Sequence, residues 1–253
     1  MDIEGLLEKK KRYEAVKDSI PEATRISLEN AFEVEYTHHS TAIEGNTLTL
    51  METKVVLEDG IAIGGKSLRE IYEVVNHNKT YRYVKECIGK GFALEENIVK
   101  DIHALLMENI LTGGIYRREE VVISGASHTP PAGSEMYAQI KNFYVELSGK
   151  KGLNNIELAA WTHAEFARIH PFLDGNCRTS RLLMNYQLMA KGFLPVYIAK
   201  EDRLTYYNAL DQYAAHGRLD DFADMIALLE EKKLDKYLEL AAIQEQEPPT
   251  QTM

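Results

Sequence analysis

The sequence HPFLDGNCRTSR, residues 170–181, places a histidine, an acid, a glycine turn and two arginines within twelve positions. Its histidine stands before a proline, where the backbone avoids the α region, so a helix is expected to end there. Asp174 and Gly175 are typical of a turn, and a second helix is predicted to begin near Asn176 or Cys177. A helix that only fills a hydrophobic core needs none of these polar groups. The stretch therefore indicates a binding or catalytic site.

The start of this predicted helix is suited to bind an anion. Its first backbone N–H groups have no intrahelical partner and carry the positive end of the helix dipole. Arg178 and Arg181 are three residues apart and share one face of the first turns, which favours a polyphosphate over a single carboxylate. Asp174 can hold a Mg²⁺ that bridges the phosphates, and His170 can accept a proton from an incoming hydroxyl. Together these groups predict nucleotide-phosphate chemistry with a histidine base.

Each of these residues also has a purely structural explanation. Asp174 can cap the helix, the arginines can pair with local glutamates, and His170 can cap a carbonyl group. A site explains all of them within one short stretch better than several unrelated structural roles do. A P-loop and an H-E-x-x-H zinc motif, which would indicate other chemistry, are absent from the sequence.

The composition favours a globular protein without nucleic-acid or membrane partners. The chain has 253 residues, 45% of them apolar, enough for one large domain or a domain with an appendage. Its formal net charge of −10 argues against duplex nucleic acid and anionic membrane surfaces. The sequence contains no apolar run near the ~20 residues of a membrane span and no signal-peptide pattern. Two cysteines, Cys87 and Cys177, are too few for a disulfide framework. We expect a cytoplasmic location.

Helical periodicity dominates and predicts an all-α fold. The predicted helices begin at residue 22, cover 68–88 and 95–111, begin after an N-cap at Ser134, cover 156–169 and 179–191, and fill 202–244. The exception is GIYRREEVVISGASHTPP, residues 114–131, whose β-branched and turn residues predict a short strand or hairpin. The polar end of the chain, residues 245–253, is predicted to be loose.

The stretch at residues 170–181 resembles the signature H-x-F-x-[DE]-G-N-G-R-x-x-R of Fic-domain proteins in the Fido superfamily, and it matches every defined position except one. The resemblance implies a Fic fold, a helical bundle with a short β-hairpin beside the active site. We call this hairpin, residues 114–131, the flap. Three regions are implied: 1–65 with an inhibitory motif, a Fic core over 66–230, and a C-terminal helix with a loose tail over 231–253.

The resemblance also assigns roles within the signature. His170 would be the general base that activates a Ser, Thr or Tyr hydroxyl of a target protein, and Asp174 would coordinate Mg²⁺. The phosphates of ATP would be bound by Gly175, Asn176, Cys177, Arg178 and Arg181, with the Asn176 side chain assisting. The implied reaction transfers AMP from ATP to the hydroxyl and releases pyrophosphate. We therefore expect a protein adenylyltransferase.

Two further segments are interpreted through the same resemblance. The flap would pair with the backbone of the target, and its residues closest to the nucleotide and target would be Ile123, Ser124, Gly125 and Ala126. Tyr206 and Tyr207 are candidates for packing on adenine, and a core role is equally compatible with either.

Cys177 is the one departure from the signature, which has glycine at this position. A side chain there can crowd a phosphate. The start of a helix nevertheless accepts cysteine, and it can lower the pKa of the thiol. We interpret Cys177 as a tolerated substitution, and a redox-sensing thiol is the less favoured alternative.

A second motif lies at residues 39–47, HSTAIEGNT. Ser40 and Glu44 are four residues apart, and Gly45 is a natural helix terminator, a pattern that alone is typical of any solvated helix end. The motif, from Ser40 to Asn46, resembles the [ST]-x-x-x-E-[GN] inhibitory motif of class II Fic proteins. The resemblance implies that Glu44 pairs with Arg181, occupies the guanidinium that the γ-phosphate needs, and holds the enzyme off.

Several alternatives remain open. In some relatives the inhibitory glutamate positions water that removes AMP, so Glu44 is also a candidate catalytic residue of a de-AMPylase. A transferase of the same fold that moves another group is a further candidate. So is a nucleotide-binding interaction protein without transfer activity. Self-modification and a homodimer are compatible with the sequence.

Overall fold

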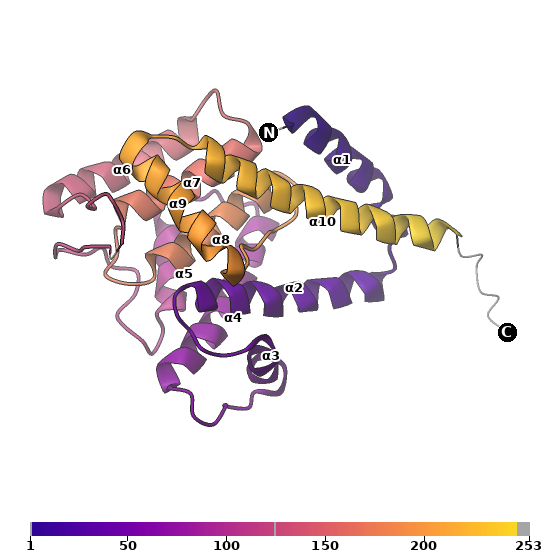
Figure 1. Ribbon diagram of the computed structural model, residues 1–253, viewed down its shortest axis with the longest axis horizontal. Helices are drawn as coiled ribbons and strands as arrows, with labels where there is room; N and C mark the ends of the chain where they lie inside the picture. The colour runs from indigo at the N-terminus through magenta and orange to yellow at the C-terminus, as the bar shows by residue number, and fades with distance from the viewer. Residues whose placement is uncertain (1, 124, 247–253) are drawn as a thin grey trace.

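The computed structural model describes residues 2–123 and 125–246, and within these ranges every regular element is a helix (Figure 1). The elements are α1 (Ile3–Val16), η1 (Lys17–Ser19), α2 (Glu22–Ile43), α3 (Leu50–Asp59), α4 (Leu68–Gly89), α5 (Glu96–Leu106), α6 (Gly133–Gly149), α7 (Asn155–Ile169), α8 (Asn176–Ala190), η2 (Lys200–Asp202), α9 (Arg203–His216) and α10 (Asp220–Gln246). The predicted all-α class is confirmed. From residue 247 on, the predicted loose tail lies outside the described residues. None of the described helices has both the length and the apolar composition of a membrane span.

Helices α7 and α8 form the centre of the bundle, and residues 170–175 are the turn between them. The side chain of Asn154 begins α7 by accepting hydrogen bonds from the amides of Ile156 and Glu157 at 2.9 and 3.0 Å. Almost all of α8 is buried, including the charged side chains of Arg178 and Arg181. Because a buried charge is costly unless it is paired, these two arginines must be compensated by neighbouring helices.

Two apolar clusters pack against this central pair. The first gathers residues of α2, α4, α5 and α6 around the loop residue Phe172, and the second gathers residues of α1, α9 and α10 around Phe222. Helix α1 lies along α10 (Figure 1), where Lys9 pairs with Glu231 and Asp235 at 2.7 and 2.9 Å. The central pair of helices is thus packed against both apolar clusters, and the turn between them contributes Phe172 to the first.

Most helix positions agree with the prediction, and two helix ends differ. Helix α5 stops at Leu106 instead of residue 111, because the side-chain amide of Asn76 in α4 donates to the carbonyls of Leu106 and Glu108 at 3.2 and 2.7 Å. Helix α6 begins at Gly133 with Ala132 as its N-cap, so the prediction of Ser134 as the cap is wrong. The first difference comes from a contact between distant segments, which local periodicity does not report.

The prediction of a β-hairpin must be corrected, because the described residues of the flap contain no strand. The buried Arg117 instead holds the segment: its guanidinium donates to the carbonyls of Glu119 at 2.7 Å, Pro131 at 2.6 Å and His170 at 2.7 Å. Backbone groups bonded to a side chain in this way are not available for a cross-strand ladder. One predicted flap residue, Ser124, lies outside the described residues.

Candidate functional site

His170 ends α7 in the left-handed conformation, with φ of 52° and ψ of 58°. This backbone is uncommon outside glycine, and Arg117 supports it by donating from Nε to the His170 carbonyl at 2.7 Å. The ring Nδ1 lies 3.3 Å from the Ala167 carbonyl, a contact that favours the Nδ1–H tautomer and leaves Nε2 as the acceptor. Burial lowers the pKa of His170 to about 4. The ring is therefore neutral near pH 7 and able to accept a proton.

Contacts of the loop itself fix its shape. The fully buried Phe172 stacks on the ring of His103, with 3.5 Å between the centroids. His103 Nδ1 accepts from the Gly114 amide at 2.8 Å, so its Nε2 donates to the Asp174 carbonyl at 2.9 Å. The Asn176 side chain bonds to both backbone groups of Phe172, accepting at 2.9 Å and donating at 2.8 Å. These bonds place the Asn176 amide within the loop, where it shapes the turn.

Gly175 and Cys177 differ in why they stand at the start of α8. Gly175 has φ of 76°, and a Cβ there would lie 2.9 Å from the sulfur of Met107, so only glycine fits without displacement. The half-buried Cys177 has no such restriction. Burial, followed by the charge of Glu44, raises the pKa of its thiol to about 12. The expectation that the helix start would lower this pKa is wrong, which argues against a redox-sensing thiol.

Arg181 is buried, and each of its three nitrogens is hydrogen-bonded. Nε donates to Ser40 Oγ at 3.0 Å, and Nη1 donates to the Tyr206 hydroxyl at 3.2 Å. Nη2 donates to the Ser40 carbonyl at 2.7 Å and to Glu44 Oε1 at 2.9 Å. Gly45, with φ of 99°, ends the helical path directly after Glu44. The structure therefore brings Ser40, Glu44 and Arg181 together.

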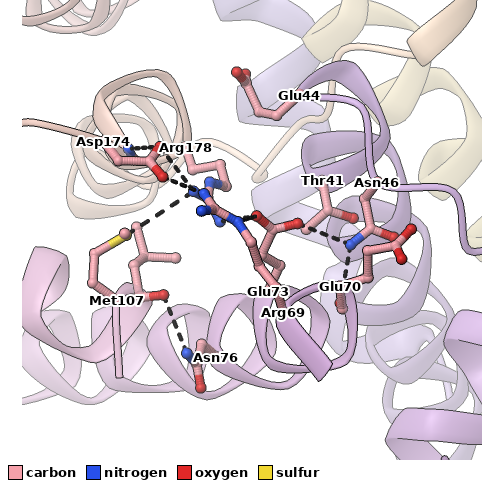
Figure 2. A network of polar contacts seen from close by, with 12 residues as sticks. Thr41, Glu44, Asn46, Arg69, Glu70, Glu73, Asn76, Met107, Asp174 and Arg178 are labelled. Atoms are coloured by element: carbon pink, nitrogen blue, oxygen red, sulfur yellow. Dashed lines mark hydrogen bonds and ion pairs between the residues drawn. The ribbon is translucent and has the colours of Figure 1, made fainter. Parts of the chain in front are cut away.

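Arg178 and Asp174 are joined to α4 by a second group of charges (Figure 2). Arg178 Nη1 lies 3.5 Å from Glu73 Oε1, and Arg178 Nη2 lies 3.4 Å from Asp174 Oδ1. The Asp174 carboxylate also accepts from the Gly175 amide at 2.6 Å and pairs with Arg69 of α4. Burial alone would raise the pKa of Asp174, but Arg178, the Gly175 amide and Arg69 together lower it. Asp174 is therefore a charged carboxylate.

A cavity of about 470 Å³ opens beside His170, and the flap and α9 form its walls. Its lining includes Glu44 and Cys177 from the two motifs, Ile123, Gly125 and Ala126 from the flap, and Leu204, Tyr207, Asn208 and Asp211 from α9. Ser127 N donates to Asp211 Oδ1 at 2.7 Å, which ties the flap to α9. An elongated ligand in this cavity would contact His170 and the start of α8.

The two adenine candidates occupy different environments. Tyr207 lines the cavity, is 37% exposed, and donates its hydroxyl to the Ile43 carbonyl at 3.3 Å. Tyr206 is fully buried beneath Arg181, and its hydroxyl also lies 3.0 Å from Nε2 of His163. The structure thus places Tyr207 alone of the pair at the cavity and Tyr206 in the core.

Sequence reasoning missed several residues of the site. Two of them could have been found from the sequence, because Asn208 directly follows the candidate Tyr207 and Asp211 lies one helical turn after it. His103 had a weaker signal as a histidine on an apolar helix face. Arg69 and Glu73 reach the site from a helix about a hundred residues earlier in the chain, and nothing in their own segment indicates it.

Comparisons with known proteins identify sequence relatives of this chain. Residues 93–188 match the model of the Fic/DOC family. The protein adenylyltransferase Fic of Nematostella vectensis is 39% identical over 209 residues, which cover 81% of this chain and 48% of the relative. The protein of the same name from Drosophila persimilis is 32% identical over 240 residues, 93% of this chain and 46% of the relative. The chain spans about half the length of these curated relatives.

Solved structures match over nearly the whole chain. A Fic domain containing signaling protein from Bacteroides thetaiotaomicron superposes with a TM-score of 0.83 at 26% identity, covering 96% of this chain and 98% of that one. A fragment of Fic-1 from C. elegans gives a TM-score of 0.81 at 29% identity, covering 94% of this chain and 70% of the fragment. The similarity therefore includes the N-terminal helices as well as the central pair.

Proposed function

Since the chain belongs to the Fic/DOC family, we propose that it transfers AMP from ATP to a hydroxyl group of a protein. One observation carries the proposal: a neutral His170 stands in the wall of a cavity that reaches the start of α8. A protein that only binds a nucleotide needs no such base. The target protein, self-modification, a homodimer and the cytoplasmic location stay predictions.

Different residues in and beside the cavity would bind the adenosine, bind the phosphates and accept the proton. The adenosine end of ATP would lie between the flap and α9, beside Tyr207 and Asn208. The phosphates would lie at the start of α8, where free amides and Arg178 favour negative charge. His170 Nε2 would take the hydroxyl proton as the oxygen attacks the α-phosphorus and pyrophosphate leaves. Charge grows on the leaving group, so the amides and arginines stabilise the transition state.

The flap would hold the target. Its described residues form no strand, yet Arg117 and Asp211 fix its backbone beside the cavity. A target segment that adds to this backbone as a strand would need little sequence similarity to other targets. We keep Ile123, Ser124, Gly125 and Ala126 as the proposed contact residues.

The site fits a Mg²⁺ ion that one carboxylate and the phosphates of ATP would bind together. In the described part of the chain, no three acidic, histidine or cysteine side chains gather as a metal site. One charged carboxylate, Asp174, lies beside the phosphate-binding start of α8. Mg²⁺ commonly binds one or two carboxylates together with substrate phosphates, and it neutralises phosphate charge there. Asp174 would be its protein ligand.

Glu44 would inhibit the transfer. It bonds to Arg181, the guanidinium that would otherwise receive a terminal phosphate, and its own charge repels that phosphate. ATP would then bind with its α-phosphate out of line for attack, and a displacement of about 1 Å can cost roughly a hundredfold in rate. Release of the 40–46 segment would free Arg181.

Removal of AMP is a second candidate activity, and one observation favours it. Glu44 lines the same cavity as His170, and its side chain remains 27% exposed while it pairs with Arg181 through Oε1. A carboxylate in that position could orient water toward a bound AMP group.

ATP labelled at the α-phosphate tests the proposal. Wild type should label itself or an added target weakly, and Glu44→Gly should raise labelling about a hundredfold. Adding His170→Ala to Glu44→Gly should lower it again by about 10²- to 10⁴-fold. Equal labelling by wild type and Glu44→Gly would contradict inhibition. Loss of label from a pre-modified target with wild type, but not with Glu44→Gly, would instead establish removal of AMP.

A further inference from the structure

Four charged side chains alternate in sign between α4 and the start of α8 (Figure 2). Arg69 contacts both Asp174 and Glu73, and Arg178 contacts the same two carboxylates. Asp174 and Arg178 are the groups to which we assign Mg²⁺ and phosphate. Before a nucleotide binds, α4 therefore supplies a cation to the proposed metal ligand and an anion to the proposed phosphate ligand.

The contacts of Arg178 are incomplete. Its side chain is 2% exposed, yet Nε and Nη1 have no hydrogen-bond partner among the described residues. The two carboxylates that neutralise it lie 3.4 and 3.5 Å away, beyond the usual length of a charge-assisted hydrogen bond. A buried donor without an acceptor costs free energy, so a phosphate oxygen would satisfy Arg178 better than Glu73 does.

Glu73 is also joined to the inhibitory motif. Asn46, the last residue of that motif, donates from Nδ2 to Glu73 Oε2 at 3.0 Å and to the Glu70 carbonyl at 2.9 Å. The 40–46 segment thus reaches both arginines of α8. Glu44 contacts Arg181 directly, and Asn46 reaches Arg178 through Glu73.

We propose that Arg69 and Glu73 are exchange partners of the triphosphate site, an inference that rests on the proposed function. When Mg²⁺ and the phosphates arrive, Asp174 leaves Arg69 for the metal, and Arg178 leaves Glu73 for phosphate oxygens. Arg69 and Glu73 then keep each other as partners. Both are positioning residues, because they act through Asp174 and Arg178.

The exchange needs little rearrangement, because Arg69 and Glu73 are already neighbours on α4. Arg69 and Glu73 are four residues apart on α4, and Arg69 Nε already lies 3.2 Å from Glu73 Oε1. Glu73 is only 11% exposed and needs a counter-charge, whereas Arg69 is 57% exposed and free to adjust its side chain. No charge is left alone after the exchange.

Binding of α,β-methylene-ATP, which cannot transfer AMP, tests the exchange by calorimetry in EDTA and in Mg²⁺. The quantity to compare is the ratio of Kd in EDTA to Kd in Mg²⁺. Arg69→Gln leaves Asp174 without its resident cation, so binding weakens in EDTA while Mg²⁺ meets no competitor. We expect the ratio to rise about two- to fivefold, the range for a partly exposed ion pair. Glu73→Gln should lower the ratio, because Arg69 then pairs with Asp174 alone.

Arg82→Gln is the matched control. Arg82 is also an exposed arginine of α4, paired with the buried Glu33 at 2.9 Å, but it lies outside the site. Its ratio should equal that of wild type. A purely structural role of Arg69 would change both Kd values in the same direction, and an unchanged ratio for Arg69→Gln would overturn the exchange alone. Failure of wild type to bind the analogue at all would overturn the proposed function with it.

Discussion

Arg178 and Arg181 lie one turn apart on α8 and are almost equally buried, at 2% and 1% exposure, but their surroundings differ. Each nitrogen of Arg181 has a hydrogen-bond acceptor, supplied by α2 and α9. Arg178 has two nitrogens without an acceptor among the described residues. Burial alone therefore does not define the role of an arginine. Arg181 joins α8 to neighbouring segments as the structure stands, whereas Arg178 has unfilled donors that the proposed phosphate ligand could fill.

The largest expected difference between the two arginines is the effect of a methionine substitution on stability. Arg181→Met removes the partner of Glu44, Ser40 and Tyr206, and we expect it to lower the free energy of unfolding by about 3 kcal/mol. Arg178→Met leaves Asp174 and Glu73 paired with Arg69, so its change should stay below about 1 kcal/mol. Urea unfolding of both variants measures the difference.

Equal losses of unfolding free energy in the two variants would show that the difference in hydrogen bonding between the arginines does not affect stability. Binding of α,β-methylene-ATP is the second measurement. Arg178→Met should weaken it even though the variant is nearly as stable as wild type, since a binding group is lost without a structural one.

A smaller effect is expected at the two tyrosines of α9. Tyr206→Phe removes the acceptor of Arg181 Nη1 and the contact with His163, which should cost about 1–3 kcal/mol of unfolding free energy. Nucleotide affinity should change little, because Tyr206 does not line the cavity. Tyr207→Phe is the matched control for stability, and Tyr207→Ala should weaken nucleotide binding. Weaker binding by Tyr206→Phe than by Tyr207→Ala would reverse this assignment.

Local pattern accounts for most of what the sequence predicted. The proline after His170 and the turn at Asp174–Gly175 placed the end of α7 and the start of α8 correctly, because both depend on backbone preferences of adjacent residues. The relation between the 40–46 and 170–181 segments came from resemblance to a family. Spacing alone would not have paired Glu44 with Arg181 across the chain.

Features that depend on distant contacts were not predictable. Arg117 and Arg118 are adjacent and chemically identical, yet only Arg117 is buried and holds the flap. The β-branched residues of the flap favoured a hairpin, but the side chains of Arg117, within the flap, and of Asp211 in α9 bind its backbone. Tyr206 and Tyr207 could not be told apart, because which of two neighbouring residues faces a cavity depends on how α9 is rotated against α7 and α8.

The smallest expected effect concerns Cys177, which directly precedes Arg178 and whose thiol is influenced by the charges of both arginines. Burial and then Glu44 raise the pKa of its thiol to about 12, while Arg181 and Arg178 lower it. At pH 8 little of this thiol is then in the thiolate form, and alkylation by iodoacetamide should be slow. Glu44→Gln removes a charge that raises the pKa, so the alkylation rate at pH 8 should increase a few-fold.

Arg178→Met removes a charge that lowers the same pKa and should slow the alkylation of Cys177. Mass spectrometry separates this thiol from the buried Cys87, whose pKa is also raised by burial and which serves as an internal control. The opposite signs of the two variants are the decisive feature, because a general loosening of the fold would accelerate alkylation in both. Acceleration in both would mean that access, and not the charges of Glu44 and Arg178, controls this thiol.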